Sequence, residues 1–223
     1  MSSAPTTDPK PTTAPKTEPV KAFPDWGTLI AAMDKAREDG DEALRALYRP
    51  RYEMAKVHGE GWATHMPLLA SVVATARPGP VLEIGVGRGS SPLLVEMCRA
   101  MGRDLVGIDS EQPWLDEIAS VLTYPSLIHM PDWSALPAWL AEHPVWSVIF
   151  IDHGPGEARL PVLKMVHEHA DVEQIVCHDV HNPGYLIGFD EYLMTKFKHY
   201  AEYVIMPSCT AVVSDVRPYG WTR

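Results

Sequence analysis

Cysteine and basic residues are both scarce in this sequence. Three of the 223 residues are cysteines, Cys98, Cys177 and Cys209, and their spacing does not match that of metal ligands. We therefore expect reduced, buried thiols instead of a disulfide framework. Lys and Arg number 19 against 29 Asp and Glu, so the formal net charge is -10 at pH 7. Because an acidic surface repels phosphate backbones, nucleic acid is not the expected substrate.

Long apolar runs are also missing. No segment approaches the roughly 20 apolar residues that span a bilayer, and the first residues lack the apolar core of a signal peptide. The sequence therefore predicts a cytoplasmic protein that has no membrane partner. Its length fits one main domain with accessory segments, and it leaves the oligomeric state open, a homo-oligomer included.

Three parts follow one another along the chain. Residues 1–22 are rich in Pro and Thr and cannot bury enough apolar surface to offset the entropy of ordering, so we expect a disordered arm. Residues 23–78 are expected to form a helical segment, because apolar residues recur at helical spacing from Trp26 onward. Residues 79–223 are expected to form the main domain, which starts within a Pro-Gly-Pro sequence ending at Pro80.

The main domain alternates strands and helices. Short apolar strands are expected near residues 81–84, 105–108, 126–129, 146–151 and 174–177. Helices are expected near residues 91–101, 113–122, 158–169 and 186–200. Two final strands, near 203–206 and 211–213, are joined by a turn too short for a parallel pair. The pattern predicts an α/β fold: a Rossmann-like, mostly parallel seven-stranded sheet with helices on both faces and a C-terminal antiparallel hairpin.

A glycine loop follows the first expected strand. Glycines let the backbone turn sharply and let a ligand approach the main chain, and the helix after the loop offers unpaired N–H groups to an anion. The spacing of a dinucleotide-binding loop is broken, since Ser90 stands where its third glycine would be. An acid at the end of the first strand suits a cationic amino group, so the loop favours a ligand with an amino-acid end. The residues of this loop are Glu83, Gly85, Gly87, Gly89 and Ser91.

A second acid, Asp109, ends the next strand. It lies about twenty residues beyond the loop, where an acid can accept hydrogen bonds from both hydroxyl groups of a ribose. The alternative is a solvent-facing loop aspartate.

Together with the terminal hairpin, these residues make the segment 80–216 resemble the class I S-adenosylmethionine-dependent methyltransferases. The resemblance implies that Glu83 and the glycine loop hold the methionine end of the cofactor, and that Asp109 holds its ribose. It also implies that Asp132 and Trp133 line the adenine, through a hydrogen bond and through ring stacking. The alternative for this pair is a helix N-cap and a core tryptophan.

Acids and histidines follow the fourth and fifth expected strands, at the edge of the sheet where the transferred methyl group would lie. Oxygen ligands there could hold a divalent cation that lowers the pKa of a hydroxyl group, or a histidine could remove the proton of the acceptor directly. Asp152 could also contact the cofactor. The candidate catalytic residues are Asp152, His153, His178, Asp179 and His181.

The stretch around Asp152 is similar to the catechol-type, metal-dependent O-methyltransferases. That similarity implies a magnesium site in which Asp152 and Asp179 match two ligands and Asn182 supplies a third, displaced from the expected position at Val180. The lysine base of that family has no match in residues 154–157. Two hypotheses stay open: a magnesium ion, or a base among the three histidines named above.

The segment before the domain, residues 57–65, contains His58, Trp62 and His65. Leading segments of this kind often fold over the cofactor as a lid. The alternative is a helix that starts at a cap residue, Thr64, with the histidines on the surface.

These features predict an S-adenosylmethionine-dependent methyltransferase that acts on a small-molecule acceptor. Oxygen is the expected acceptor atom, and nitrogen and carbon acceptors stay open. Two alternatives use the same residues. One is an aminopropyltransferase-like or other nucleotide-ligand enzyme on the same fold. The other is a non-catalytic partner subunit that binds S-adenosylmethionine and docks through the Pro/Thr-rich arm. The cluster of acids and histidines favours an enzyme, because a binding-only subunit does not need it.

Overall fold

The computed structural model describes residues 65–180, 188–205 and 208–219. The predicted disordered arm and most of the predicted helical segment lie outside these residues, and the boundaries of the three parts stay predictions. His58, Trp62, His181 and Asn182 also lie outside the described residues.

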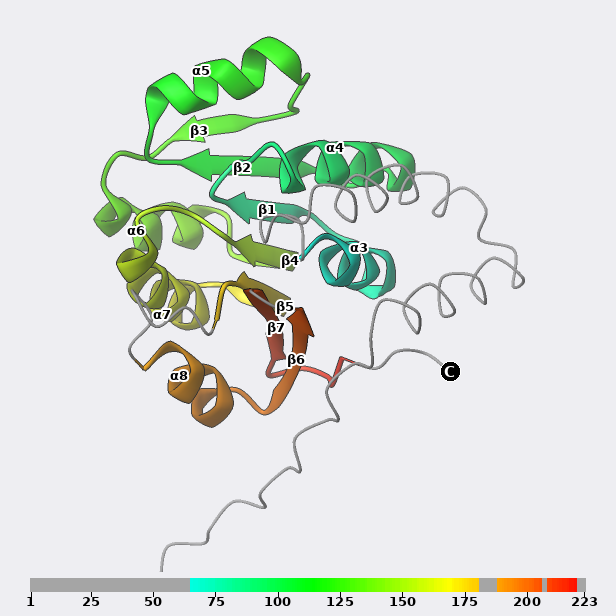
Figure 1. The fold of residues 1–223 in the computed structure, drawn as a ribbon, viewed down its shortest axis with the longest axis vertical. Helices are drawn as coiled ribbons and strands as arrows, with labels where there is room; N and C mark the ends of the chain where they lie inside the picture. The colour runs from blue at the N-terminus through cyan, green and yellow to red at the C-terminus, as the bar shows by residue number, and fades with distance from the viewer. Residues whose placement is uncertain (1–64, 181–187, 206–207, 220–223) are drawn as a thin grey trace, which may run out of the picture.

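One mixed sheet organises the described part of the chain (Figure 1). Its seven strands lie in the order β3-β2-β1-β4-β5-β7-β6. Strands β1 to β5 run parallel to one another, and β7 pairs antiparallel with both β5 and β6. The strands are β1 (Val81–Ile84), β2 (Leu105–Asp109), β3 (Leu127–His129), β4 (Val145–Ile151), β5 (Asp171–His178), β6 (His199–Ile205) and β7 (Ser208–Ser214). The predicted fold class, with its antiparallel C-terminal hairpin, is confirmed.

Helices cover both faces of this sheet (Figure 1). The helices α3 (Met66–Thr75) and α4 (Ser90–Met101) pack on one face, and α5 (Gln112–Val121) packs beside β2 and β3. The opposite face carries α6 (Leu136–Glu142), α7 (Arg159–His169) and α8 (Phe189–Lys196). None of these helices is long and apolar enough to cross a membrane.

The last predicted helix extends beyond the end of α8, which is Lys196. The expectation of a helix over residues 186–200 is wrong at its C-terminal end, because His199 and Tyr200 pair with Ser214 and Val213 in the sheet. The pairing partner lies on β7, so no local pattern distinguishes this strand from the end of α8. Helix α6 was not predicted at all.

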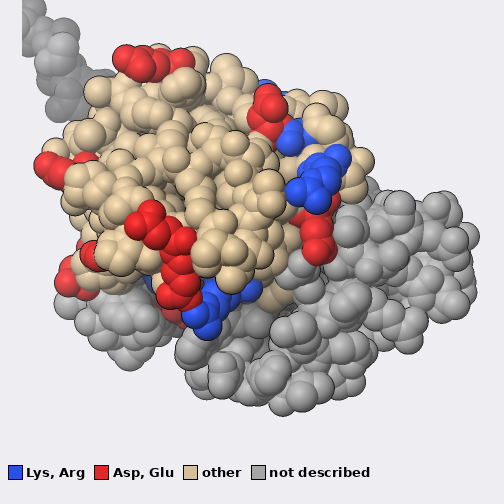
Figure 2. All heavy atoms as spheres, turned by 90° about the horizontal axis from the view of Figure 1, so that it is seen from above, with Lys and Arg blue, Asp and Glu red and all other residues tan. Residues whose placement is uncertain are grey.

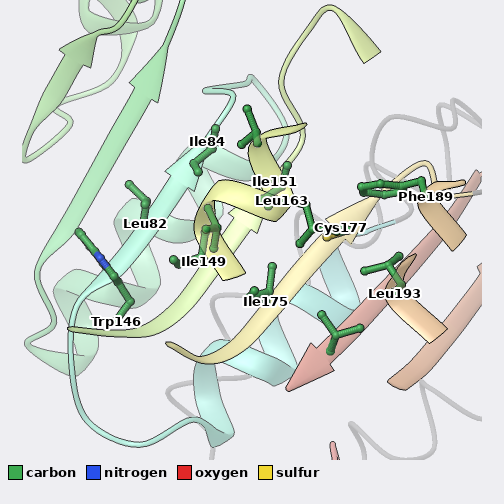
Figure 3. Packing of buried hydrophobic residues seen from close by; sticks show 14 of the residues in the cluster. Leu82, Ile84, Trp146, Ile149, Ile151, Leu163, Ile175, Cys177, Phe189 and Leu193 are labelled. Atoms are coloured by element: carbon green, nitrogen blue, oxygen red, sulfur yellow. The ribbon is translucent and has the colours of Figure 1, made fainter. Parts of the chain in front are cut away.

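The strand β4 separates two apolar layers. Val148 and Phe150 belong to the apolar cluster that includes residues of α3 and α4. Ile149 and Ile151 belong to the cluster on the opposite face, with residues of α6, α7 and α8 (Figure 3). All four side chains are fully buried. A central parallel strand that is covered on both faces reads as a continuous apolar run, which is the pattern observed here. The three cysteines are buried and free, as predicted.

The register of the parallel strands places the predicted site at one edge of the sheet. Ile84 pairs with Ile108 and with Ile151, and Ile151 pairs with Cys177. The residues that directly follow these four therefore emerge side by side. They are Gly85, Asp109, Asp152 and His178. The strand order reverses between β1 and β4, and this switch point is where open α/β sheets bind their ligands.

Candidate functional site

The glycine loop lies directly on the end of β4. Gly85 has a φ of +96°, and a Cβ atom placed on it would come within 2.4 to 2.5 Å of backbone atoms of Asp152 and His153. Its N–H donates to the carbonyl of Ile108, at 2.8 Å. Only glycine fits both this backbone conformation and this approach. The contact brings the loop against the residues predicted to carry catalysis.

A buried carboxylate supports the loop from below. The Ser91 hydroxyl accepts the N–H of Gly87 at 2.8 Å and donates to Oε2 of Glu83, also at 2.8 Å. The Tyr124 hydroxyl donates to the same oxygen, at 2.8 Å. Glu83 is fully buried, and its Oε1 has no hydrogen-bond partner in the described residues. The contact of Glu83 with a cofactor amino group stays a prediction, and its role in holding Ser91 and Tyr124 was not foreseen.

Burial dominates the ionisation of Glu83. It raises the pKa of this carboxyl group from an ordinary value of 4.5 to about 7, although hydrogen bonds from neighbouring hydroxyl groups act in the opposite direction. Near neutral pH the carboxyl group of Glu83 is therefore partly protonated in the folded protein.

Asp109 ties the second strand to the glycine loop. Its Oδ2 accepts the N–H of Val86 at 3.1 Å, and its Oδ1 accepts the N–H of Glu111 at 3.0 Å. The residue is only 8% exposed, so the alternative of a solvent-facing loop aspartate is wrong. Burial raises the pKa of Asp109, and the backbone hydrogen bonds lower it in part. Its contact with a ribose stays a prediction.

The two predicted adenine residues differ in their surroundings. Asp132 is exposed and accepts the N–H of Ser134 at 2.8 Å, which is the N-cap arrangement weighed as the alternative. The Trp133 ring packs against His153, with ring centroids 4.5 Å apart. Trp133 Nε1 and His153 Nε2 are both buried, without a hydrogen-bond partner among the described residues. Adenine binding by this pair stays a prediction.

The ends of β4 and β5 carry a compact charged cluster, which consists of Asp152, His178, Asp179 and Arg159. His178 Nδ1 lies 3.2 Å from Oδ1 of Asp152, and its Nε2 lies 3.6 Å from Oδ1 of Asp179. Arg159 Nη2 lies 2.9 Å from Oδ1 of Asp152, and its Nη1 lies 3.5 Å from Oδ2 of Asp179. The predicted acids and His178 are thus brought together, with an arginine between them.

Sequence reasoning missed Arg159. It is the first residue of α7 and is 7% exposed. Its Nε donates to the carbonyl of His153 at 2.8 Å, and its Nη1 donates to the carbonyl of His178 at 3.0 Å. The only signal in the sequence was indirect: two acids predicted at a buried edge need a compensating positive charge.

Two further histidines border this cluster. His65 precedes α3, is 1% exposed, and has no hydrogen-bond partner in the described part of the chain at either ring nitrogen. Its ring centroid lies 4.5 Å from that of His178, so the alternative of a surface histidine at this position is wrong. Burial lowers the pKa of His65 to about 3 and that of His153 to about 4. Both are therefore neutral, weak bases at pH 7.

The residues present do not fit the magnesium site that the catechol-type similarity implies. Mg²⁺ requires close octahedral coordination by oxygen ligands. The two matching carboxylates, Asp152 and Asp179, are instead both paired with the guanidinium group of Arg159. Val180, at the position expected for the third ligand, is apolar and buried.

Comparison with known proteins gives information on the fold. No family model matches this chain, and no curated protein matches its sequence. Human methyltransferase-like protein 13, in complex with S-adenosylhomocysteine, is 17% identical with a TM-score of 0.52, over 68% of this chain and 82% of that chain. The O-methyltransferase TomG from Streptomyces achromogenes, involved in tomaymycin synthesis and in complex with S-adenosylmethionine, is 17% identical with a TM-score of 0.51, over 68% and 78%. An rRNA methylase from Streptococcus thermophilus is 10% identical with a TM-score of 0.50, over 70% and 97%.

The chain has the class I methyltransferase fold. Identities this low establish the fold alone. The acceptor cannot be carried over from these neighbours, because one fold serves many substrates.

The close packing of Gly85 against the end of β4 can be tested by adding one methyl group. Gly85→Ala should lower the free energy of unfolding by at least about 2 kcal/mol, because the positive φ and the backbone of Asp152 and His153 both oppose a Cβ atom. Gly87→Ala is the matched control, since a Cβ there meets only Ser90 Oγ, at 3.5 Å. Urea denaturation measures both. Equal stability of the two variants would contradict the described packing.

The buried Glu83 predicts a specific pH dependence of stability. Its native pKa of about 7 exceeds its ordinary 4.5, so between these values the native state holds a proton that the unfolded chain has lost. The free energy of unfolding should therefore fall as pH rises through this window, by up to about 1.4 kcal/mol per pH unit.

Glu83→Gln should remove this contribution, and the exposed Glu142→Gln should retain it. Urea denaturation at pH 5, 6, 7 and 8 gives the slope of stability against pH for each protein. Glu83 would not be the titrating group if its variant kept the wild-type slope.

Proposed function

We propose that this protein transfers a methyl group from S-adenosylmethionine to an oxygen atom of a small molecule. One observation carries the proposal: the glycine loop at Gly85 lies in direct contact with the backbone of Asp152 and His153, beside the charged cluster at the ends of β4 and β5. A cofactor site and a proton-transfer site are thereby adjacent. The complexes of TomG and of methyltransferase-like protein 13 support this choice of cofactor.

The residues at the sheet edge fit this cofactor. The loop backbone is accessible without a side chain at Gly87 and Gly89, and helix α4 begins directly after it, with N–H groups suited to a carboxylate. Asp109 would hold the ribose. In the expected adenine segment, Trp133 Nε1 has no hydrogen-bond partner among the described residues, and the same holds for Nε2 of the adjacent His153. When bound, S-adenosylmethionine supplies the electrophilic methyl group.

His178 is the proposed general base. With its Nδ1 proton directed toward Asp152, its Nε2 is the atom that would accept the proton of the acceptor hydroxyl. The imidazolium that forms would lie between the carboxylates of Asp152 and Asp179, which stabilise its charge. His153 and His65 are less suited, because their lowered pKa values of about 4 and about 3 make them weaker bases.

The charge of the protein favours a small-molecule acceptor over nucleic acid. Nucleic acid binding relies on Lys and Arg contacts to phosphates, and this chain has a net charge of -10. On the face shown in Figure 2, basic groups of the described residues are few and stand beside acidic ones, without a continuous basic surface. An rRNA acceptor is therefore disfavoured, although a neighbour with this fold is an rRNA methylase.

The charged cluster at the ends of β4 and β5 disfavours an aminopropyltransferase. A polyamine acceptor requires acids that can pair with its ammonium groups. Asp152 and Asp179 already pair with Arg159, which would repel such a substrate. A non-catalytic partner subunit, the remaining alternative, would tolerate substitution of His178 without a functional change.

Substitution of His178 tests the catalytic proposal. Turnover is measured as release of S-adenosylhomocysteine with a panel of phenols, catechols and alcohols. His178→Asn should lower kcat by about 100-fold or more with the best acceptor, because the general base is lost, while affinity for S-adenosylhomocysteine stays within about threefold.

The exposed His169→Asn, at the far end of α7, serves as the control and should keep wild-type turnover. Undiminished kcat in His178→Asn would refute the role of His178 as the base. A wild-type protein that methylates nothing in the panel but methylates an RNA oligonucleotide would refute the small-molecule acceptor.

A further inference from the structure

Two carboxylates and a histidine converge at the proposed reaction site and need a compensating charge. Asp152 and Asp179 are both less than a quarter exposed, and His178 lies between them. Acids at these two places are the ones that match magnesium ligands in the catechol-type enzymes. Leaving them uncompensated in a partly buried site would be costly, because buried like charges repel strongly.

The compensating charge comes from the chain itself. The guanidinium group of Arg159 reaches Asp152 through Nη2 and Asp179 through Nη1, at 2.9 and 3.5 Å. It also donates to the carbonyls of His153 and His178, which directly follow Asp152 and precede Asp179 in the sequence. One side chain thus joins the residues at the carboxyl ends of β4 and β5 by charge and by backbone hydrogen bonds. Its planar, permanently charged group suits this fixed arrangement of acceptors.

We propose that Arg159 is the built-in cation of this site, which takes the place of a divalent metal ion between Asp152 and Asp179 and positions Asp152 against His178. The role of Arg159 in methyl transfer rests on the proposed function. Its exclusion of a metal ion from the site does not depend on that function. Arg159 is a positioning residue: it acts on the acceptor only through Asp152 and His178. Methyl transfer by this protein then requires no added metal.

The electrostatics of Asp152 agree with this role. Burial opposes its ionisation, but His178 chiefly, and His65 and Arg159 to a smaller extent, lower the pKa of Asp152 below its ordinary value. Asp152 therefore remains a carboxylate at neutral pH and can orient His178.

A transition metal is the competing occupant of the same place. Ligand atoms of His65, Asp152 and His178 lie within 4.8 Å of one another, which is a spacing that a metal ion could bridge. Such an ion would have to share Asp152 with the guanidinium group, 2.9 Å away. The positive charge of Arg159 therefore opposes this site as well as a magnesium site.

Metal titration of the full-length protein tests the proposal directly. MgCl₂, MnCl₂ and ZnCl₂ are titrated by calorimetry into wild type, Arg159→Ala, Arg159→Lys and the control Arg99→Ala, which removes an exposed arginine of α4. Wild type, Arg159→Lys and the control should bind none of the three at millimolar concentration. Arg159→Ala should bind Mn²⁺ with a Kd of about 100 μM or less, at least tenfold below the millimolar range in which wild type shows no binding, because its two carboxylates have lost their cation.

Activity supplies a second readout. Wild-type turnover should survive EDTA, and millimolar Mn²⁺ or guanidinium ion should restore part of the turnover lost in Arg159→Ala.

Micromolar binding of any of the three metals by wild type, or loss of wild-type turnover in EDTA, would overturn the proposal. The wild-type measurements decide the matter even if Arg159→Ala does not fold. Failure to bind S-adenosylhomocysteine would overturn the proposed function alone, because the metal titrations contain no cofactor.

Discussion

Gly85 lies against the backbone of Asp152 and His153, at the switch point between β1 and β4, with no room for a Cβ atom between them. This contact fixes the distance between the glycine loop and the charged cluster. The parallel register extends it sideways, so that Asp109 and His178 emerge beside the same pair of strands. Because β4 is buried on both faces, the edge that carries these residues is held by the centre of the core and not by surface loops. A transfer reaction that depends mainly on alignment is well served by such rigidity.

Buried charge is the second organising feature. Glu83 lies beneath the loop, where hydroxyl groups of Ser91 and Tyr124 hold one of its oxygens. The acids at the ends of β4 and β5 are instead held by Arg159 and His178. These two devices perform different tasks, since the first shapes the loop backbone and the second orders groups that can exchange a proton. The chain itself supplies polar partners to both, as buried polar groups require, except that Oε1 of Glu83 has none among the described residues.

The sequence allowed much of this arrangement to be predicted, for physical reasons. Strands that alternate with helices imply a parallel sheet, and the carboxyl ends of parallel strands share one edge, so Asp109, Asp152 and His178 could be expected together. Contacts between distant segments could not be predicted. Arg159 begins a helix, as many charged residues do, and nothing local shows that it faces two acids. Tyr124 lies in a connection after α5, and its hydrogen bond to Glu83 spans 41 residues. His199 and Tyr200 pair with residues of β7, which follows later in the chain. Because the local sequence contains no sign of this pairing, they were assigned to the preceding helix.

Calorimetric titration of the purified protein with S-adenosylhomocysteine and with NAD tests the central claim most directly. The glycine loop, the broken dinucleotide spacing at Ser90 and the adjacent charged cluster predict micromolar binding of S-adenosylhomocysteine and no binding of NAD. Binding of NAD with none of S-adenosylhomocysteine would contradict the proposed cofactor. Absence of binding for both would mean that the loop at Gly85 serves another ligand or the packing of β4 alone.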